Sequence, residues 1–231
     1  MKTLAIITAR GGSKRIPRKN IKEFLGKPII CYSIESSIAS NVFDEIMVST
    51  DDVEIAEIAK KAGANVPFLR SEATSNDYAT TNEVILEVLK EYQKMGKEFD
   101  HVACLYPTNP FITPQKIRDA YRLIVEKKCA EVVPMVKFSY PPQRAYVLND
   151  RNEASFKWPE FKNARSQDLE NMYHDAGQFY FYDAKSYLEH GGVYGPIVPY
   201  ICPETEVQDI DTLEDWKLAE LKVEFLNRGI N

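Results

Sequence analysis

A loop rich in cations lies close to the start of the chain. Gly11 and Gly12 are adjacent, and around them stand five cations: Arg10, Lys14, Arg15, Arg18 and Lys19. Glycines let backbone N–H groups approach an anion closely, and cations neutralise its charge. The stretch contains neither Gly-x-x-x-x-Gly-Lys-Ser/Thr nor Gly-x-Gly-x-x-Gly. It therefore predicts a triphosphate-binding loop of another type. The alternative is a solvated basic loop, which the interleaved glycines, serine, proline and asparagine disfavour.

A pair of carboxylates, Asp209 and Asp211, lies near the C-terminus. Side chains at i and i+2 of an extended segment can face the same side and offer oxygens to one cation. Mg²⁺ binds few protein carboxylates and takes its other ligands from phosphates and water. The pair predicts a Mg²⁺ site, with Mn²⁺ as a second possible metal. Alternatively, Asp211 serves only as the N-cap of the helix that follows.

The elements that position these residues alternate along the first half of the chain. Apolar runs predict strands at 4–7, 45–49, 102–106 and 131–135, with a brief extended piece at 66–69 and a loop at 70–79. Helical periodicity and caps predict helices at 28–40, from 50–52 to Gly63, from a Thr80–Glu83 capping box, and from Thr113. This order predicts an α/β fold: a mostly parallel, twisted, Rossmann-like sheet with helices on both faces. The turn after 106 should then meet the cation-rich loop at one sheet edge.

The pattern changes after residue 136. Residues 137–170 are rich in aromatics and prolines and show no helical periodicity. We expect an inserted arm of irregular strands within a single domain, 1–231. Exposed aromatics indicate a partner surface, so we expect a homodimer; a floppy loop is the alternative. A strand at 178–182, a helix at 185–190, a strand at 195–201 and a final helix capped by Asp211 or Thr212 should follow. The two apolar rows of that last helix predict burial around much of its circumference.

Composition narrows the class of protein. Hydrophobic residues make up 44% of the chain and charged residues 27%, as in ordinary globular proteins. A net charge of −5 disfavours a nucleic-acid partner. The four cysteines are isolated in apolar contexts, which predicts buried free thiols in a reducing compartment. No run is long and apolar enough for a membrane span and no signal peptide is evident, so we expect a cytoplasmic protein. No nucleophile accompanies His174 and Asp175, and the three histidines are scattered, which disfavours a hydrolytic triad and a zinc site.

The loop sequence Ala-Arg-Gly-Gly-Ser-Lys-Arg-Ile-Pro-x-Lys-Asn, followed by Leu-Gly-Lys-Pro-Ile at 25–29, resembles the N-terminal signature of the CMP-sialic acid synthetases (acylneuraminate cytidylyltransferases). The resemblance reaches Asp-Ile-Asp at 209–211 and so covers nearly the whole chain. Three stretches resemble the pseudaminic acid cytidylyltransferase branch most: 138–145, 165–170 and 173–180. The resemblance implies a nucleotide-diphospho-sugar transferase-like fold. It also implies Mg²⁺-dependent transfer of CMP from CTP to a nine-carbon 2-keto sugar acid, for surface glycan or flagellin glycosylation.

The resemblance also implies roles for individual residues. Arg10, Lys19, Asp209 and Asp211 would be catalytic, and the two aspartates would hold the metal. The nucleotide would contact Ala9, Arg10, Gly11, Gly12, Ser13, Lys14, Lys19, Asn20, Arg70, Thr80 and Thr108. The sugar acid would contact Tyr106, Gln143, Arg144, Arg165, Gln167 and Tyr180. Tyr106 stands where sialic acid synthetases usually carry glutamine, so its role is open.

Other functions fit the same residues. The same chemistry could act on N-acetylneuraminate or legionaminate, or more distantly on 3-deoxy-manno-octulosonate. A module that senses CTP without turnover is a different class, which the complete loop and the intact carboxylate pair disfavour. No residue type or spacing identifies a general base for the anomeric hydroxyl.

Overall fold

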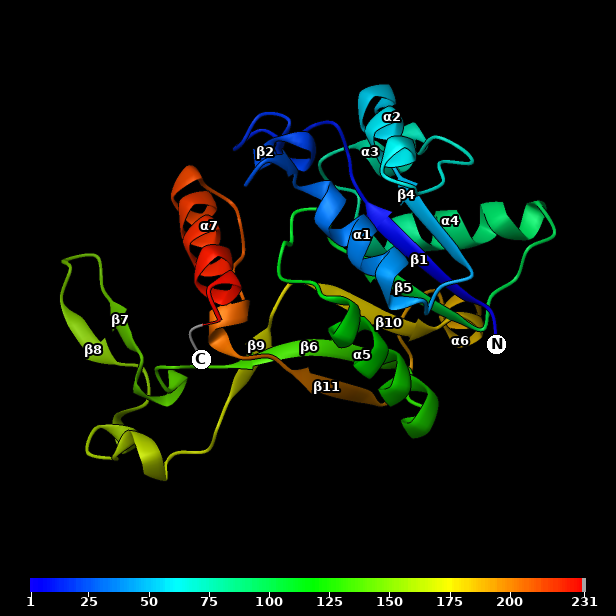
Figure 1. Cartoon of the computed structure of the whole chain (residues 1–231). Helices are drawn as coiled ribbons and strands as arrows, with labels where there is room; N and C mark the ends of the chain where they lie inside the picture. The colour runs from blue at the N-terminus through cyan, green and yellow to red at the C-terminus, as the bar shows by residue number, and fades with distance from the viewer. Residues whose placement is uncertain (230–231) are drawn as a thin grey trace.

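In the computed structural model, which describes residues 1–229, a seven-stranded sheet runs through the centre of the chain (Figure 1). Its order is β11-β6-β10-β5-β1-β4, and β9 pairs with β6 off this path. The strands are β1 (Thr3–Thr8), β4 (Glu45–Ser49), β5 (His101–Leu105), β6 (Glu131–Lys137), β9 (Tyr173–Asp175), β10 (Phe179–Asp183) and β11 (Ile197–Ile201). Only β9 and β10 run against the other five. The mostly parallel sheet is therefore confirmed.

Helices cover both faces of this sheet, as predicted. Apolar side chains of α1 (Ile30–Ser40), α2 (Val53–Lys61) and α5 (Pro114–Lys127) pack in one core with Ile7 and Phe181. A second core joins α4 (Thr81–Lys94) and α6 (Ala184–His190) to Leu4 and Cys104. Residues that alternate along β1 enter opposite cores, which explains why this strand reads as a continuous apolar run. The Thr80–Glu83 capping box and the Thr113 cap are both confirmed.

Two local predictions in the first third of the chain are wrong. Pro28 does not begin a helix; it lies in β3 (Lys27–Pro28), which pairs with β2 (Glu23–Phe24), and α1 begins two residues later. The predicted loop at 70–79 contains a short helix, α3 (Glu72–Ser75), where Thr74 and Ser71 are both bonded to Glu87 of α4. A four-residue helix is too short to show a period, so it depends on this tertiary contact.

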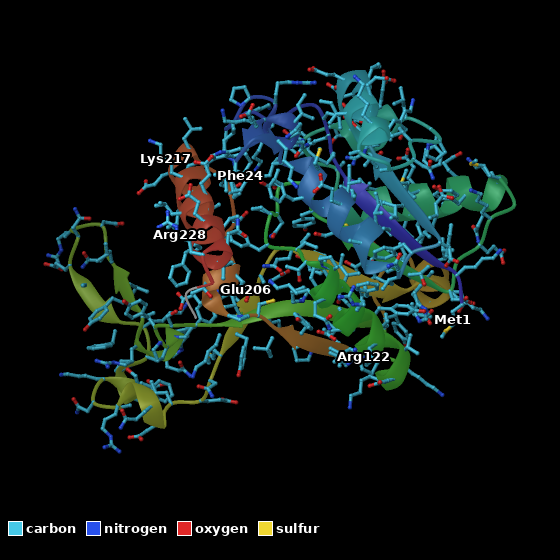
Figure 2. The ribbon with its side chains drawn as sticks, viewed as in Figure 1. Met1, Phe24, Arg122, Glu206, Lys217 and Arg228 are labelled. Carbon is cyan, nitrogen blue, oxygen red and sulfur yellow. The ribbon has the colours of Figure 1, made fainter. Side chains whose placement is uncertain are left out.

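The last helix, α7 (Leu213–Asn227), is covered on one side only. Trp216, Ala219 and Val223 are buried with Phe24, which lies beside α7 (Figures 1 and 2). The second apolar row is exposed, since Leu218 is 44%, Leu221 63% and Phe225 42% accessible. The predicted burial around much of its circumference is therefore wrong. Thr212 is the N-cap and Asp215 completes a capping box, so Asp211 is not needed as a cap.

The predicted arm projects from one end of the sheet (Figure 1). Its two ends lie together because β6 and β9 pair with Lys137 opposite Tyr173. Between them are a small hairpin of β7 (Tyr146–Leu148) and β8 (Ala154–Phe156) and 3-10 turns at Pro142–Arg144, Pro159–Phe161 and Ser166–Asp168. The segment therefore consists of one short hairpin and 3-10 turns.

The cysteines agree with the prediction from composition. All four cysteines are buried and free, as expected. Within residues 1–229, no helix combines the length and the apolar character that crossing a membrane requires.

Candidate active site

The cations of the first loop are paired with carboxylates from elsewhere in the chain. Arg10 donates from Nη1 to Asp77 Oδ1 at 2.8 Å, and Lys14 pairs with the other oxygen of Asp77. Both hydrogen bonds lower the pKa of the Asp77 carboxyl, that from Lys14 more. Asp77 therefore sits as an anion on two of the predicted phosphate-binding side chains.

The same loop also meets the C-terminal carboxylate pair. Arg15 Nη1 lies 2.7 Å from Asp211 Oδ2, and Lys19 Nζ lies 3.7 Å from Asp211 Oδ1 while donating to the carbonyl of Ile210 at 2.6 Å. Ile210 is buried in the cluster that joins the loop to α7. The structure thus brings Lys19 and Asp211 together, and it adds Arg15, which the sequence did not single out as a site residue.

Gly11 is fixed in place by the start of α2. Its N–H donates to Asp51 Oδ1 at 2.9 Å, and a Cβ at this position would lie 2.7 Å from Asp52 Oδ2. Asp52 caps α2 and is held by Arg18, whose hydrogen bond lowers the pKa of the Asp52 carboxyl. Gly12 has open space around its Cβ position. Gly11 is therefore required by packing, whereas Gly12 leaves the backbone open to a ligand.

Other predicted nucleotide residues shape the loop from within. Ala9 is buried and its N–H donates to Ser49 O at 2.9 Å. Asn20 is also buried, and its side-chain amide donates to the carbonyl of Arg10 at 2.8 Å. The predicted contact between the Asn20 amide and cytidine would therefore compete with this bond. Ser13 is partly exposed near the tip of the loop.

Arg70, the predicted cytosine contact, is buried beside the end of β4. Its Nη2 donates to Ser49 O at 2.7 Å, and its Nε donates to Ser49 Oγ at 3.1 Å. Burial lowers the pKa of the guanidinium. Thr80 is engaged in the capping box of α4, and Thr108 lies partly buried in the turn after β5. These three residues surround the same carboxyl edge of the sheet as the cation-rich loop.

A cavity of about 610 Å³ opens next to this edge. Tyr106, at the end of β5, lies in its wall together with Asp209 and Asp175. The Tyr106 ring meets the ring of Tyr180 edge-on, with centroids 5.5 Å apart. The volume falls within the range of small-molecule pockets. Two predicted residues, Tyr106 and Asp209, are thus brought to one cavity.

A buried polar cluster of Lys116, Gln178 and Glu206, which the sequence did not predict, lies next to the cavity wall. Lys116 of α5 is 4% exposed and its Nζ lies 2.9 Å from Glu206 Oε2. Gln178 is fully buried, accepts from Lys116 at 3.4 Å and donates to Glu206 O at 2.6 Å. These bonds fix the segment that leads to Asp209. The sequence feature that could have indicated this cluster is the position of Lys116, which directly precedes the apolar row Ile117, Ala120 and Ile124 on the buried side of α5.

The predicted sugar-binding residues of the arm are not among the residues that line this cavity. Gln143 is buried and donates to Glu170 O at 2.9 Å, and Arg165 pairs with Asp168 at 2.7 Å. Arg144 lies 3.5 Å from Ser166 Oγ. Gln167 lines a neighbouring hollow of about 220 Å³, which shares Lys137, Phe138 and Ser139 with the cavity wall. Within one chain the structure does not bring these four residues to the cation-rich loop, and their role stays a prediction.

The carboxylate pair fits a metal that takes few protein ligands. Asp209 is exposed at the cavity wall, and Asp211 is held beside the cations of the loop. Over the described part of the chain, no three His, Cys, Asp or Glu side chains gather closely enough to hold a metal by themselves. Two carboxylates beside a group of cations would suit Mg²⁺ if a phosphate bound there, because its remaining ligands are usually phosphate oxygens and water.

Comparison with known proteins gives the class to which this fold and site belong. A family model described as cytidylyltransferase matches residues 4–200, and the chain is a member of this cytidylyltransferase family. It is 43% identical over 222 residues to the pseudaminic acid cytidylyltransferase of Campylobacter jejuni, covering 96% of both chains. It is 35% identical to the CMP-N,N'-diacetyllegionaminic acid synthase of Legionella pneumophila, covering 97% of both.

A solved structure supports the fold. CMP:2-keto-3-deoxy-manno-octonic acid synthetase complexed with CTP superimposes with a TM-score of 0.68 at 18% identity, over 99% of this chain and all of that one. At this identity the likeness concerns architecture, and it agrees with the predicted nucleotide-diphospho-sugar transferase-like fold.

Proposed function

We propose that this protein transfers CMP from CTP to the anomeric hydroxyl of pseudaminic acid and releases pyrophosphate. The observation that carries the reaction type is the meeting of the cation-rich loop with the Asp209–Asp211 segment beside a cavity. The choice of sugar is supported by 43% identity to the Campylobacter enzyme along nearly the full length of both chains. In the reaction, the anomeric oxygen forms a bond to the α-phosphorus. The bond from that phosphorus to the bridging oxygen breaks, and the hydroxyl proton is lost.

The chain's own residues account for much of what this displacement needs. A bound triphosphate would exchange for Asp77 on Arg10 and Lys14, so the cations gain one anion as they lose another. Lys19, kept in place by the Ile210 carbonyl, would add charge at the leaving pyrophosphate. Mg²⁺ bound by Asp209 and Asp211 would neutralise further phosphate charge. Catalysis then depends on positioning and charge rather than on a covalent intermediate.

We propose in addition that the protein acts as a homodimer through the 137–170 arm. The hairpin of the arm exposes Tyr146, Val147 and Leu148, and Tyr140 before it is 89% exposed. An exposed apolar surface on an element without a core of its own favours a partner. Arg144, Arg165 and Gln167 could then reach the cavity of the other subunit. A cytoplasmic location, where CTP is available, completes the proposal.

Pyrophosphate release tests the proposed function directly. The purified protein is incubated with CTP, Mg²⁺ and, in separate reactions, pseudaminic, legionaminic and N-acetylneuraminic acid. We expect turnover with pseudaminic acid and poor turnover with N-acetylneuraminate. The Legionella relative makes legionaminate the second candidate, and a higher kcat/KM with it would reassign the sugar. Binding of CTP without pyrophosphate release from any sugar acid would favour the sensor module instead.

Asp211→Asn tests the metal site. We expect turnover to be nearly abolished while the fold is kept, because Thr212 and not Asp211 caps α7. Unchanged circular dichroism and thermal unfolding would serve as the control. Wild-type turnover by this variant in Mg²⁺ would remove the Asp211 carboxylate from the mechanism.

A further inference from the structure

Asp175 is a carboxylate of the site with both oxygens held by hydrogen bonds and with no ion pair within residues 1–229. It ends β9, opposite Met135 of β6, so the sheet register sets its position. Its Oδ1 accepts the Gly177 N–H at 2.7 Å and its Oδ2 accepts the Tyr180 hydroxyl at 2.8 Å. The residue is nevertheless exposed, in the wall of the 610 Å³ cavity. Each oxygen keeps a free lone pair that can accept from a ligand.

The cation partners differ between this end of the site and the phosphate loop. Asp77 and Asp211 each pair with two loop cations, and Asp52 pairs with Arg18. Among the ion pairs within residues 1–229, none includes Asp175. A fixed carboxylate without a cation repels an anionic group and attracts a neutral hydrogen-bond donor.

Tyr180 acts on the cavity through Asp175. Its ring is 7% exposed and is not part of the cavity wall, while its hydroxyl is directed at the carboxylate. Burial raises the pKa of this phenol, so it remains a donor throughout the neutral range. Tyr180, predicted as a sugar contact, is in this arrangement a positioning residue.

We propose that Asp175 is a specificity-determining residue that accepts a hydrogen bond from a neutral donor of the sugar acid, an amide N–H or a hydroxyl. This inference rests on the proposed function. The carboxylate of the sugar must lie away from Asp175, because the two charges repel. Asp175 therefore contacts the part of the sugar that lies away from its carboxylate. Sugar acids of this class differ there in the identity and orientation of their substituents. A sugar that presents no donor there would leave the acceptor unpaired and be rejected.

The test compares discrimination rather than activity alone. We would measure kcat/KM for the preferred sugar acid and for the poorer ones in wild type, Asp175→Asn and Tyr180→Phe. A hydrogen bond to a charged group is worth about 1.5–3 kcal/mol, so Asp175→Asn should reduce the ratio between good and poor sugars by about 10- to 150-fold. The loss should appear mainly in the KM for the sugar, with the KM for CTP unchanged. Tyr180→Phe should give a smaller change in the same direction. Asp119→Asn, which removes a surface charge on α5, is the matched control and should keep the wild-type ratio.

The outcomes separate this inference from the proposed function. If Asp175→Asn lowered kcat/KM equally for all sugar acids, or raised the KM for CTP as much as that for the sugar, Asp175 would be structural and only the inference would fall. If the wild-type protein released no pyrophosphate with any sugar acid, the proposed function would fall and the inference with it. Thermal unfolding of each variant shows whether it remains folded under assay conditions.

Discussion

Gly11→Ala offers a sharp test of how the cation-rich loop is held against α2. The added Cβ would lie 2.7 Å from Asp52 Oδ2, 3.1 Å from its Cβ and 3.3 Å from its Cγ. Asp52 cannot simply turn away, because it caps α2 at Ile55 and is bonded to Arg18. Either the loop must shift or the cap must be lost.

Typical losses of stability are known for both outcomes, the loss of the α2 cap and the overpacking of the loop. Loss of an N-cap costs about 1 kcal/mol, and overpacking costs about 1–3 kcal/mol. We expect Gly11→Ala to lower the free energy of unfolding by about 2 kcal/mol, because the molecule takes the less costly of the two routes. For a chain of this length, that lowers Tm by about 4–8 °C. Urea unfolding followed by circular dichroism gives the free energy, and a thermal scan gives Tm.

Gly12→Ala is the matched control, since no atom lies within 4 Å of its Cβ position. It should change the free energy of unfolding by less than about 0.5 kcal/mol. A double-mutant cycle makes the cause specific: in an Asp52→Gly background, Gly11→Ala should cost under about 1 kcal/mol. The reasoning fails if Gly11→Ala costs no more than Gly12→Ala, or if its cost persists after Asp52 has been shortened.

Three further predictions use other parts of the molecule. Burial, together with the charge of Asp175, raises the pKa of Glu131 from 4.5 to about 7, so the folded protein keeps a proton that the unfolded chain releases. The free energy of unfolding should therefore fall by about 2 kcal/mol as the pH rises from about 4.5 to 7. Glu131→Gln should flatten this pH dependence in urea titrations carried out across the pH range. An unchanged slope in the variant would assign the pH dependence to another group. Asp77→Asn should lower the KM for CTP about two- to fivefold, because the two loop cations lose a competing anion, whereas a raised KM would mean that the carboxylate positions them. Lys116→Met should lower the free energy of unfolding by about 3 kcal/mol, because Glu206 loses its buried partner; a neutral effect by calorimetry would show that the cluster adds no stability.

Much of the fold could be predicted because its signals are local. The continuous apolar run of β1, the Thr80–Glu83 capping box and the Thr113–Pro114 start of α5 each depend on a few neighbouring residues. Alternating strands and helices then limit the sheet to few topologies. The loop and the Asp209–Asp211 pair could be predicted to meet only through the family resemblance, since they lie at opposite ends of the chain.

What could not be predicted depends on contacts between distant segments. Nothing near Asp77 in sequence shows that it pairs with Arg10 and Lys14. The exposure of one side of α7 could not be predicted for the same reason. An apolar row shows which side chains a helix could bury, but not whether another element covers them. The buried Lys116 would have been assigned to the surface by residue type alone, because its partner comes from the 204–206 segment.

The charges around the site explain how one edge of the sheet can receive two anionic substrates. At the loop, every cation has a carboxylate partner, so the chain alone is close to balanced there. Under the proposed function, a triphosphate would enter by exchange for Asp77. At the cavity, Asp175 is fixed by two donors and has no cation among the ion pairs of residues 1–229. A sugar acid that placed its carboxylate near Asp175 would be repelled, whereas one that turned its carboxylate toward the loop would meet the cations. Because the anomeric carbon carries that carboxylate, the same orientation brings the reacting hydroxyl toward the phosphates. Under this inference, the fixed Asp175 carboxylate contributes to both substrate orientation and substrate choice.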